Sequence, residues 1–387
     1  MPIALVVSSI VEKGPLWVVS ALLHQHPLPE QQVILIELQA PREEGESLRQ
    51  RLRAEGIRIE SMRETLWRLE LATHRVARRL ALLLDQLGVS LVHSHTYHPD
   101  LVVSLLPKRF IRISTLHNRA TEDFVYNKGV IMGWYMWFRY KHALGRIQHL
   151  VGISEATTAY YARRLPKGLF QTIPNGIPLP ADWEQDPLCD KSILRKQLGL
   201  SVDPSAPMVV AVGVYSPLKN HETLLEALAH LATKDPLWRR ASVLFLGSGS
   251  QLERYKKMAS SLGVHALFLG NVPSVVPYMQ AADVYVSASL SEGFGLTVVE
   301  AALSRCPMVL SRIPSFEEFA HRLPLLKEFL INPRDIVQCA KKISRAVGVE
   351  YLKSDVHSFI SYYSAQRMSR EYVSLYQKLL TPINSKS

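Results

Sequence analysis

Glu292-Gly-Phe-Gly-Leu-Thr-Val-Val-Glu300 is the stretch that decides the fold, because it joins an apolar strand to an apolar helix. The glycines at 293 and 295 let a ligand approach the backbone closely. The helix that follows, Leu296–Leu303, presents unpaired N–H groups and the positive end of its dipole, which favour an anion. We expect Glu292 and Glu300 to hold hydroxyl groups on either side of a diphosphate. A glycine-rich turn with two solvated glutamates is the alternative that spacing alone leaves open.

Strands and helices alternate around this stretch. The apolar runs that predict strands are Met208–Val212, Ser242–Leu246, Ala266–Leu269, Val284–Ser287 and Met308–Ser311. Such alternation predicts a parallel sheet covered by helices, with ligands bound beyond the carboxyl ends of its strands. Gly213 follows the first of these strands, and Lys219 precedes a helix with Asn220 as its N-cap. Lys219 is placed to offer a point charge to phosphate, and a solvated turn lysine is the alternative.

The first half of the chain shows the same alternation. Its predicted strands are Ile3–Ser8, Val33–Leu38, Ile57–Ile59, Leu91–His95, Ile111–Leu116 and His149–Ile153. Pro15 suits the first position of a helix, and Ser47–Glu55 and Leu66–Gly88 predict two more helices. Polar residues end several strands, among them His95 and His117. The chain is therefore α/β, with two doubly wound, Rossmann-like domains facing each other across a cleft.

Five prolines between 178 and 207 separate the two arrays. This composition marks a domain boundary. We predict a first domain over 1–178, a linker over 179–206 and a second domain over 207–360. A last helix is predicted within 361–387.

Composition limits the classes of protein. Lys and Arg number 45 against 34 Asp and Glu, a net charge of +11 that would attract phosphorylated ligands, nucleic acid or an anionic membrane. Cys189, Cys306 and Cys339 are widely spaced, which suits a reducing compartment. The sequence contains neither a membrane-spanning stretch nor the basic start of a signal peptide. We expect a cytosolic protein that could be held at a membrane surface.

Metal binding is not expected from the histidines. His93 and His95 would share one face of a strand, and His98 follows in the next loop. No fourth ligand and no His-Glu-x-x-His pattern supports zinc. A substrate contact from His95 at the strand end is favoured over a metal, with ordinary polar packing as the alternative. Because the chain also has no Asp-x-Asp, we expect no metal clamp on a diphosphate.

The segment 124–154 is aromatic, basic and free of acidic residues. Its aromatic and basic side chains include Tyr126, Trp134, Tyr135, Trp137, Phe138, Tyr140, Lys128, Arg139, Lys141 and Arg146. Such a segment can lie at a membrane interface or receive a lipid-linked acceptor. A buried helix with a basic rim is the alternative, and on sequence alone we favour it. Nucleic-acid binding is not expected, because the strand–helix alternation points to diphosphate sites instead.

Taken together, these motifs resemble the retaining glycosyltransferases of family 4, which have the GT-B fold. The resemblance rests on Glu292 with Glu300, on Gly213 with Lys219, and on Ile173-Pro-Asn-Gly-Ile177 and Phe268-Leu-Gly-Asn-Val272. The stretches Gly14-Pro15, Ser114-Thr-Leu-His-Asn118 and Glu122-Asp-Phe124 resemble the branch that builds bacterial O-antigen and capsule. The last helix would then cross back to the first domain. One departure is Val214, where the family often has an arginine.

The resemblance implies a role for each matching position. Glu292 would bind donor-sugar hydroxyls, Glu300 the ribose, and Lys219 the leaving diphosphate. His117 would lie at the reacting sugar. The remaining donor-site positions are Gly14, Gly213, Val272, Gly293, Phe294, Gly295, Leu296 and Thr297. His95, Asn118 and Arg119 are candidates for the acceptor site, and Arg119 could replace the missing arginine.

The function implied is a retaining transfer of a hexose or N-acetylhexosamine from a UDP- or GDP-sugar to a lipid-linked saccharide. The partners are that donor, that acceptor and the cytosolic face of a bacterial inner membrane, with no cofactor. The pathway would make surface polysaccharide. The negative charge that grows on the departing diphosphate would be stabilised by Lys219 and by backbone N–H groups. A pair of carboxylates for double displacement is not identifiable. Two alternatives remain: an epimerase or phosphorylase of the same fold, and a non-catalytic nucleotide-sugar-binding protein.

Overall fold

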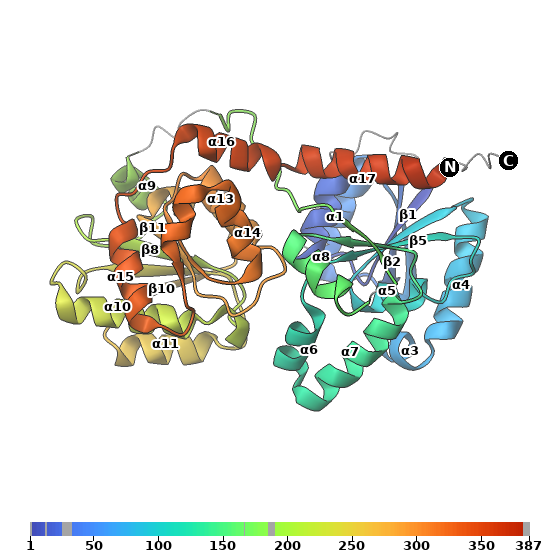
Figure 1. Cartoon of the computed structure of the whole chain (residues 1–387), viewed down its shortest axis with the longest axis horizontal. Helices are drawn as coiled ribbons and strands as arrows, with labels where there is room; N and C mark the ends of the chain where they lie inside the picture. Colours follow the sequence, from blue (N-terminus) through green and yellow to red (C-terminus); the bar gives the residue numbers. More distant parts are fainter. Residues whose placement is uncertain (1, 12–13, 25–32, 166, 185–189, 382–387) are drawn as a thin grey trace. The chain divides into compact units, whose positions relative to one another are not determined.

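The computed structural model describes residues 2–11, 14–24, 33–165, 167–184 and 190–381. The chain folds into two compact units (Figure 1). Unit 1 comprises Met1–Pro178 and Tyr363–Ser387, and unit 2 comprises Leu179–Tyr362. The stretch 179–206, predicted as a linker, therefore belongs to unit 2, and it contains helix α9 (Lys191–Gln197).

Unit 1 is built on a seven-stranded sheet in the order β3-β2-β1-β4-β5-β6-β7, and every pairing between its neighbouring strands is parallel. Its strands are β1 (Ile3–Val7), β2 (Val33–Gln39), β3 (Arg58–Glu64), β4 (Leu91–His95), β5 (Ile111–Leu116), β6 (His149–Gly152) and β7 (Leu169–Thr172). The strand order reverses between β1 and β4, so the loops after these two strands diverge and leave a crevice, as in other doubly wound sheets.

Helices cover both faces of this sheet. They are α1 (Pro15–His24), α2 (Glu46–Ala54), α3 (Leu66–Leu71), α4 (Thr73–Gln86), α5 (Tyr97–Val103), α6 (Ala120–Lys128), α7 (Val130–Leu144), α8 (Glu155–Ala162) and α17 (Ala365–Leu380), with a 3-10 turn η2 (Glu43–Gly45). One core lies between β1, β2, α1, α2 and α17, and a second lies under α4 on the opposite face. The chain thus returns to unit 1 at its last helix.

Unit 2 repeats the plan with a six-stranded parallel sheet in the order β10-β9-β8-β11-β12-β13. Its strands are β8 (Met208–Val212), β9 (Ser242–Leu246), β10 (His265–Gly270), β11 (Val284–Ser287), β12 (Met308–Ser311) and β13 (Leu330–Ile331). Its helices after α9 are α10 (His221–Lys234), α11 (Leu252–Ser261), α12 (Val276–Ala281), α13 (Leu296–Leu303), α14 (Pro314–Arg322), α15 (Ile336–Ala346) and α16 (Lys353–Tyr362), with 3-10 turns η3 (Pro217–Lys219) and η4 (Pro324–Phe329). Here the order reverses between β8 and β11.

The predicted strands are confirmed, and two further ones were missed. Buried strands carry continuous apolar runs, which is why β1 and β8 are recognisable from sequence. By contrast β7 is a four-residue edge strand with alternating exposure, and β13 has only two residues. Cys306 and Cys339 are buried free thiols, and Cys189 lies outside the described residues. None of the described helices has the length and apolar composition needed to cross a membrane.

The single helix predicted over Leu66–Gly88 is wrong, because the chain breaks at Ala72 into α3 and α4. Two carbonyl groups freed by the break find partners. The Thr73 hydroxyl donates to Leu69 O at 2.7 Å, and the Arg139 guanidinium of α7 donates to Glu70 O at 2.9 Å. The break therefore depends on a side chain far along the sequence, which helical periodicity cannot show.

Helix α17 is fastened to the unit 1 sheet by a buried polar chain. The Tyr376 hydroxyl is hydrogen bonded with His93 Nδ1 at 2.6 Å, and His93 Nε2 with the Thr115 hydroxyl at 2.7 Å. Thr115 in turn is hydrogen bonded with the Tyr372 hydroxyl at 2.8 Å. Burial lowers the pKa of His93 to about 3, so its ring is neutral and one nitrogen donates while the other accepts.

Replacing Tyr376 by Phe should destabilise the protein. The variant leaves the buried Nδ1 atom of His93 without its partner, at a cost of about 1–2 kcal/mol. Urea denaturation gives the free energy of unfolding. Tyr126→Phe is the control, because the Tyr126 side chain is exposed and its loss should change little. Equal unfolding free energies for Tyr376→Phe and the wild type would contradict the fastening of α17 through His93.

Candidate active site

Two loops meet at the reversal of strand order in unit 2, one after β8 and one after β11. They are bonded to each other, because Leu290 N donates to Leu218 O at 2.8 Å. The loops bring together Lys219 and Glu292, which are 73 residues apart in sequence. Lys219 Nζ lies 2.5 Å from Glu292 Oε1, with side chains that are 23% and 14% exposed. From the sequence, both residues were predicted in loops that join a strand to a helix. The structure brings the two side chains together as an ion pair.

The Lys219 side chain lies against the backbone of Gly213. Gly213 has φ of +146°, and a methyl group added there would stand 3.1 Å from Lys219 Cε. Asn220 stands at the N-cap position of α10, as predicted, but it adopts a left-handed conformation and its side chain makes no capping hydrogen bond. Its amide instead donates to Ala288 O at 3.1 Å and to Pro333 O at 2.7 Å, which fixes the loop to the end of β11. Glycine and Asn220 thus hold Lys219 in place.

Glu292 sits between that lysine and the start of α13. The Ser289 hydroxyl donates to Glu292 Oε1 at 2.8 Å and is itself hydrogen bonded with the Ser287 hydroxyl at 3.1 Å. Neither serine was predicted as a site residue, although Ser287 ends β11 and Ser289 follows it by two residues. The carboxylate therefore accepts from an ammonium and a hydroxyl, as it would from sugar hydroxyls.

The start of α13 is held open by Gly295. This residue has φ of +106°, and a methyl group added there would lie 2.7 Å from Phe316 Cε1, so a side chain does not fit. The neighbouring Phe294 is buried and packs edge-on against Phe319. First-turn N–H groups, here those of Leu296 and Thr297, have no partner within an α-helix and can meet an anion. The Thr297 hydroxyl faces the other way, bonded with the Tyr285 hydroxyl at 2.7 Å.

Glu300 lies one turn further along α13 and is half-buried. Among the described residues its carboxyl group has no hydrogen-bond or ion-pair partner, although its backbone carbonyl accepts from Ser304. Burial raises the pKa of the Glu300 carboxyl to about 7. A carboxyl group kept without a partner in this position is suited to receive hydroxyl groups from outside the protein.

Three other predicted positions surround this cluster. Gly293 lies in the loop between Glu292 and α13, and Val272 is half-exposed in the loop after β10. Val214, where the family often has an arginine, is 60% exposed. Gly247 ends β9 so close to Gly213 that a methyl group on it would stand 2.1 Å from Gly213 O. The glycines therefore allow the ends of β8 and β9 to touch.

In unit 1 the histidines form a buried row at the ends of β4 and β5. The rings of His93 and His95 are 4.2 Å apart, and His95 Nδ1 is hydrogen bonded with His117 Nε2 at 3.0 Å. Burial lowers the pKa of His117 to about 3, and that of His95 well below its ordinary value. His98 turns away to pair with Glu70. Among the described residues no group of three or more His, Cys, Asp or Glu is placed to hold a metal.

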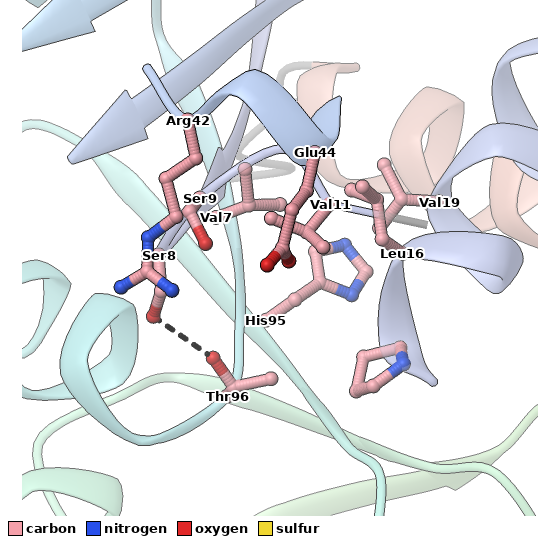
Figure 2. A pocket seen from close by; sticks show the side chains of 11 residues that line it. Val7, Ser8, Ser9, Val11, Leu16, Val19, Arg42, Glu44, His95 and Thr96 are labelled. Carbon is pink, nitrogen blue, oxygen red and sulfur yellow. Dashed lines mark hydrogen bonds between the residues drawn. The ribbon is translucent and has the colours of Figure 1, made fainter. Parts of the chain in front are cut away.

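A cavity of about 220 Å³ opens where β1 and β4 end, at the strand reversal of unit 1. Figure 2 shows His95 among its lining with Arg42, Glu44 and Thr96. His95 Nε2 has no hydrogen-bond partner among the described residues. Thr96 has φ of +78°, a strained conformation often stored at functional sites, and its hydroxyl is bonded with Ser8. Arg42, Glu44 and Thr96 were missed, because their positions depend on chain reversal rather than on any motif.

The other candidates of unit 1 are engaged with their neighbours. Gly14 has φ of +46° in the turn before Pro15. The Asn118 amide donates to Asp123 Oδ2 at 2.9 Å. The Arg119 guanidinium pairs with Glu122 at 2.8 Å and lies over the Tyr160 ring. Arg119 is thus committed to contacts within unit 1, which weakens its candidacy as a replacement for the missing arginine.

Two family models match the chain. Residues 27–179 match "Glycosyltransferase Family 4", and residues 191–357 match "Glycosyl transferases group 1". Two doubly wound units in one chain are the architecture of the GT-B class. The chain belongs to the GT-B glycosyltransferases of the family 4 type.

Curated proteins with similar sequences also carry glycosyltransferase names. A D-inositol 3-phosphate glycosyltransferase of Nocardia farcinica is 31% identical over 58% of this chain and 51% of its own length, so the match spans about half of that relative. The O-antigen biosynthesis glycosyltransferase WclY of Escherichia coli is 25% identical over 76% of this chain and 80% of its own length.

Solved structures with a similar fold cover nearly the whole chain. HepE of Anabaena in complex with UDP is 16% identical, covers 98% of this chain and 100% of its own, and has a TM-score of 0.75. HepE was also solved in complex with UDP and glucose. At this identity the likeness shows the fold alone.

Lys219 and Glu292 should be strongly coupled energetically. Either Lys219→Met or Glu292→Gln leaves the other half-buried group without its partner, so each single variant should lose stability. The double variant should lose less than the sum of the two single losses. A double-mutant cycle in urea should give a coupling of about 1–3 kcal/mol. The control cycle uses Lys256 and Glu253, an exposed pair 2.9 Å apart, for which we expect less than about 0.5 kcal/mol. Equal couplings would refute a special environment at Glu292.

Glu300 should make stability depend on pH. Its folded pKa of about 7 exceeds the ordinary value of 4.5, so the folded protein holds a proton that the unfolded chain releases as pH rises between these values. Stability is therefore lost over this window, and Glu300→Gln should be more stable than the wild type by about 3 kcal/mol at pH 8 but by less than about 1 kcal/mol at pH 5. Thermal unfolding across this range tests it. Glu253→Gln, at an exposed site, should show no such trend, and a flat Glu300→Gln difference would disprove the shift.

Proposed function

We propose that this glycosyltransferase moves a hexose or N-acetylhexosamine, with retention of anomeric configuration, from a UDP- or GDP-sugar to a lipid-linked saccharide. The single observation that carries the proposal is the cluster in unit 2. There an ammonium, two carboxyl groups and an open helix start lie within one strand reversal. Each group matches one part of a nucleoside diphosphate sugar.

Donor binding uses these groups in turn. The diphosphate lies at the first-turn N–H groups of α13, where dipole and unpaired donors favour anions. Glu300, which has no partner among the described residues, accepts the ribose hydroxyls. Backbone near Val272 contacts the base. The support from relatives is that HepE was solved with UDP and with UDP and glucose.

Donor binding also exchanges the partners of Lys219. In this structure Lys219 Nζ is paired with Glu292, which neutralises both charges. A diphosphate offers Lys219 a denser negative charge, and sugar hydroxyls offer Glu292 new donors. The exchange leaves no half-buried charge alone at any stage, because each group gains a partner as it gives one up. Since Val214 supplies no second cation, Lys219 and the helix start carry the diphosphate charge.

The acceptor saccharide is assigned to unit 1. Its cavity at the ends of β1 and β4 offers hydroxyl, guanidinium, carboxylate and imidazole groups, the mixture that hydroxyl-rich ligands need. His95 Nε2 is an unpartnered buried atom beside that cavity. His117 remains neutral because burial lowers its pKa to about 3, so it acts as a hydrogen-bond partner of the reacting sugar rather than as a cation.

Retention is proposed to occur by attack on the same face of the sugar. The bond between the anomeric carbon and the diphosphate oxygen breaks, and the bond to the acceptor oxygen forms. The acceptor proton passes to the departing phosphate oxygen, so no carboxylate nucleophile is required. Lys219 and the α13 N–H groups stabilise the charge that grows on the diphosphate. No metal is needed in this scheme, because protein groups supply the positive charge.

The setting proposed is synthesis of bacterial surface polysaccharide at the cytosolic face of the inner membrane. It is supported by WclY, whose name assigns it to O-antigen biosynthesis and which aligns over 76% of this chain. The lipid-linked acceptor and the membrane are proposals that follow from that pathway.

A panel of UDP- and GDP-sugars tests the function, with and without a polyprenyl-diphosphate saccharide, and with EDTA. We expect one donor to be consumed only when acceptor is present, with EDTA having no effect and the product keeping the donor anomeric configuration by NMR. Glu300→Ala should weaken binding of the active nucleotide about ten-fold or more, equivalent to 1.4 kcal/mol per factor of ten. Glu253→Ala is the control.

Other outcomes identify the alternatives. Donor rearranged without acceptor would indicate an epimerase, and turnover dependent on free phosphate a phosphorylase. Nucleotide binding without consumption of any donor would indicate a binding protein and end the enzyme proposal. Unchanged nucleotide affinity of Glu300→Ala would remove Glu300 from the donor site.

A further inference from the structure

Unit 1 carries an exposed apolar surface on the helical hairpin formed by α6 and α7. Six large hydrophobic side chains of α7 are exposed: Val130, Ile131, Met132, Trp134, Tyr135 and Phe138. We call these six the hairpin surface. Ile131 is 89% exposed and Phe138 74%. Monomeric proteins seldom leave such a concentration of large apolar groups in water without a partner for it.

The hairpin surface lies on the side of α7 that faces away from the core of unit 1. The opposite face of the helix is buried through Gly133, Trp137, Tyr140 and Leu144, at the spacing of a core-facing stripe. A methyl group on Gly133 would stand 2.6 Å from Val125 Cα, so the two helices are in close contact. The Tyr140 hydroxyl also donates to the buried carboxyl of Asp100 at 2.7 Å. The buried helix that the sequence favoured therefore describes one face of α7, and the hairpin surface is the other face.

Helix α3 extends the apolar area beside α7. Arg139 of α7 is bonded to both the side chain and the carbonyl of Glu70 on α3, which keeps the two helices together. Leu66, Trp67 and Leu71 of α3 are each more than half exposed. Figure 1 draws α6, α7 and α3 along one edge of unit 1. Apolar groups are thus exposed on neighbouring helices rather than scattered.

The charges on α7 and at the turn before it have one sign, while the acidic residues of α6, Glu122 and Asp123, lie in its first turn. No acidic residue occurs from 124 to 154, and the exposed Lys128 stands at the hairpin turn. Lys141 and Arg146 follow at the other end of α7, and these three cations form no ion pair among the described residues. The single acidic residue of α3, Glu70, is already paired with Arg139 and His98. An apolar face bordered by unpaired cations complements an interface of acyl chains and lipid phosphates.

We infer that the hairpin surface inserts into the headgroup region of an anionic bilayer and holds unit 1 at the membrane. The inference rests on the proposed transfer to a lipid-linked acceptor, since docking there would bring the enzyme to that substrate. Trp134 and Tyr135 suit the interface, because each has an apolar ring with one polar group. A bilayer is favoured over a protein partner by the unpaired cations on both sides of the apolar face.

Vesicle flotation tests the inference with full-length protein and phosphatidylcholine vesicles, with and without phosphatidylglycerol. The wild type should bind the anionic vesicles, and Ile131→Ser/Trp134→Ser/Phe138→Ser should weaken partition about ten-fold or more. A matched control, Leu169→Ser/Val337→Ser/Leu352→Ser, removes three apolar side chains exposed by 63%, 59% and 70% elsewhere and should bind normally. Lys128→Gln/Lys141→Gln/Arg146→Gln should lose the preference for phosphatidylglycerol.

These measurements distinguish a failure of membrane docking from a failure of the proposed sugar transfer. The triple serine variant should keep its thermal midpoint and its nucleotide affinity, since no altered residue lies in unit 2. Vesicle binding without consumption of any donor would leave the hairpin inference standing and remove the proposed function. Absence of wild-type binding at low ionic strength, or normal binding by the triple serine variant, would overturn the inference. A dimer that this variant disperses would overturn it too, by assigning the surface to a second copy.

Discussion

The reversal of strand order between β8 and β11 is the constraint on which the unit 2 site depends. At that point neighbouring loops leave the sheet in different directions, so backbone N–H groups and side chains can face a ligand instead of each other. Glycines at 213, 247 and 295 remove the side chains that would fill this space. Lys219 and Glu292 then occupy it as an ion pair. The pair balances the two charges at the site.

Unit 1 uses the same sheet topology for a different chemistry. Where unit 2 presents charge, the ends of β4 and β5 present neutral imidazoles, because burial lowers the pKa of His93 and His117 to about 3. Neutral rings can donate and accept hydrogen bonds without attracting phosphate. The two units thus share a sheet plan but present different side chains at their strand ends.

The sequence allowed the strands and helix α13 to be predicted, since both depend on local pattern. Apolar runs of four or five residues marked the buried strands β1, β2 and β8. The break at Ala72 was hidden, because Arg139 contributes to it from 67 residues away. The Lys219–Glu292 pair was hidden for the same reason: each residue was found, but their contact needs the folded sheet. The capping role assigned to Asn220 failed because tertiary hydrogen bonds outweighed the local preference.

The return of α17 to unit 1 has a consequence for synthesis of the protein on the ribosome. The core of unit 1 includes Tyr372 and Tyr376, yet these residues are made only after the whole of unit 2. Chain elongation at about 5–20 residues per second delays their appearance by roughly ten seconds or more after residue 178. Unit 2 can therefore fold as a continuous segment during translation. Until then unit 1 lacks the α17 part of the cover on one sheet face, and His93 lacks its tyrosine partner, so a chaperone could bind the apolar area that is still exposed.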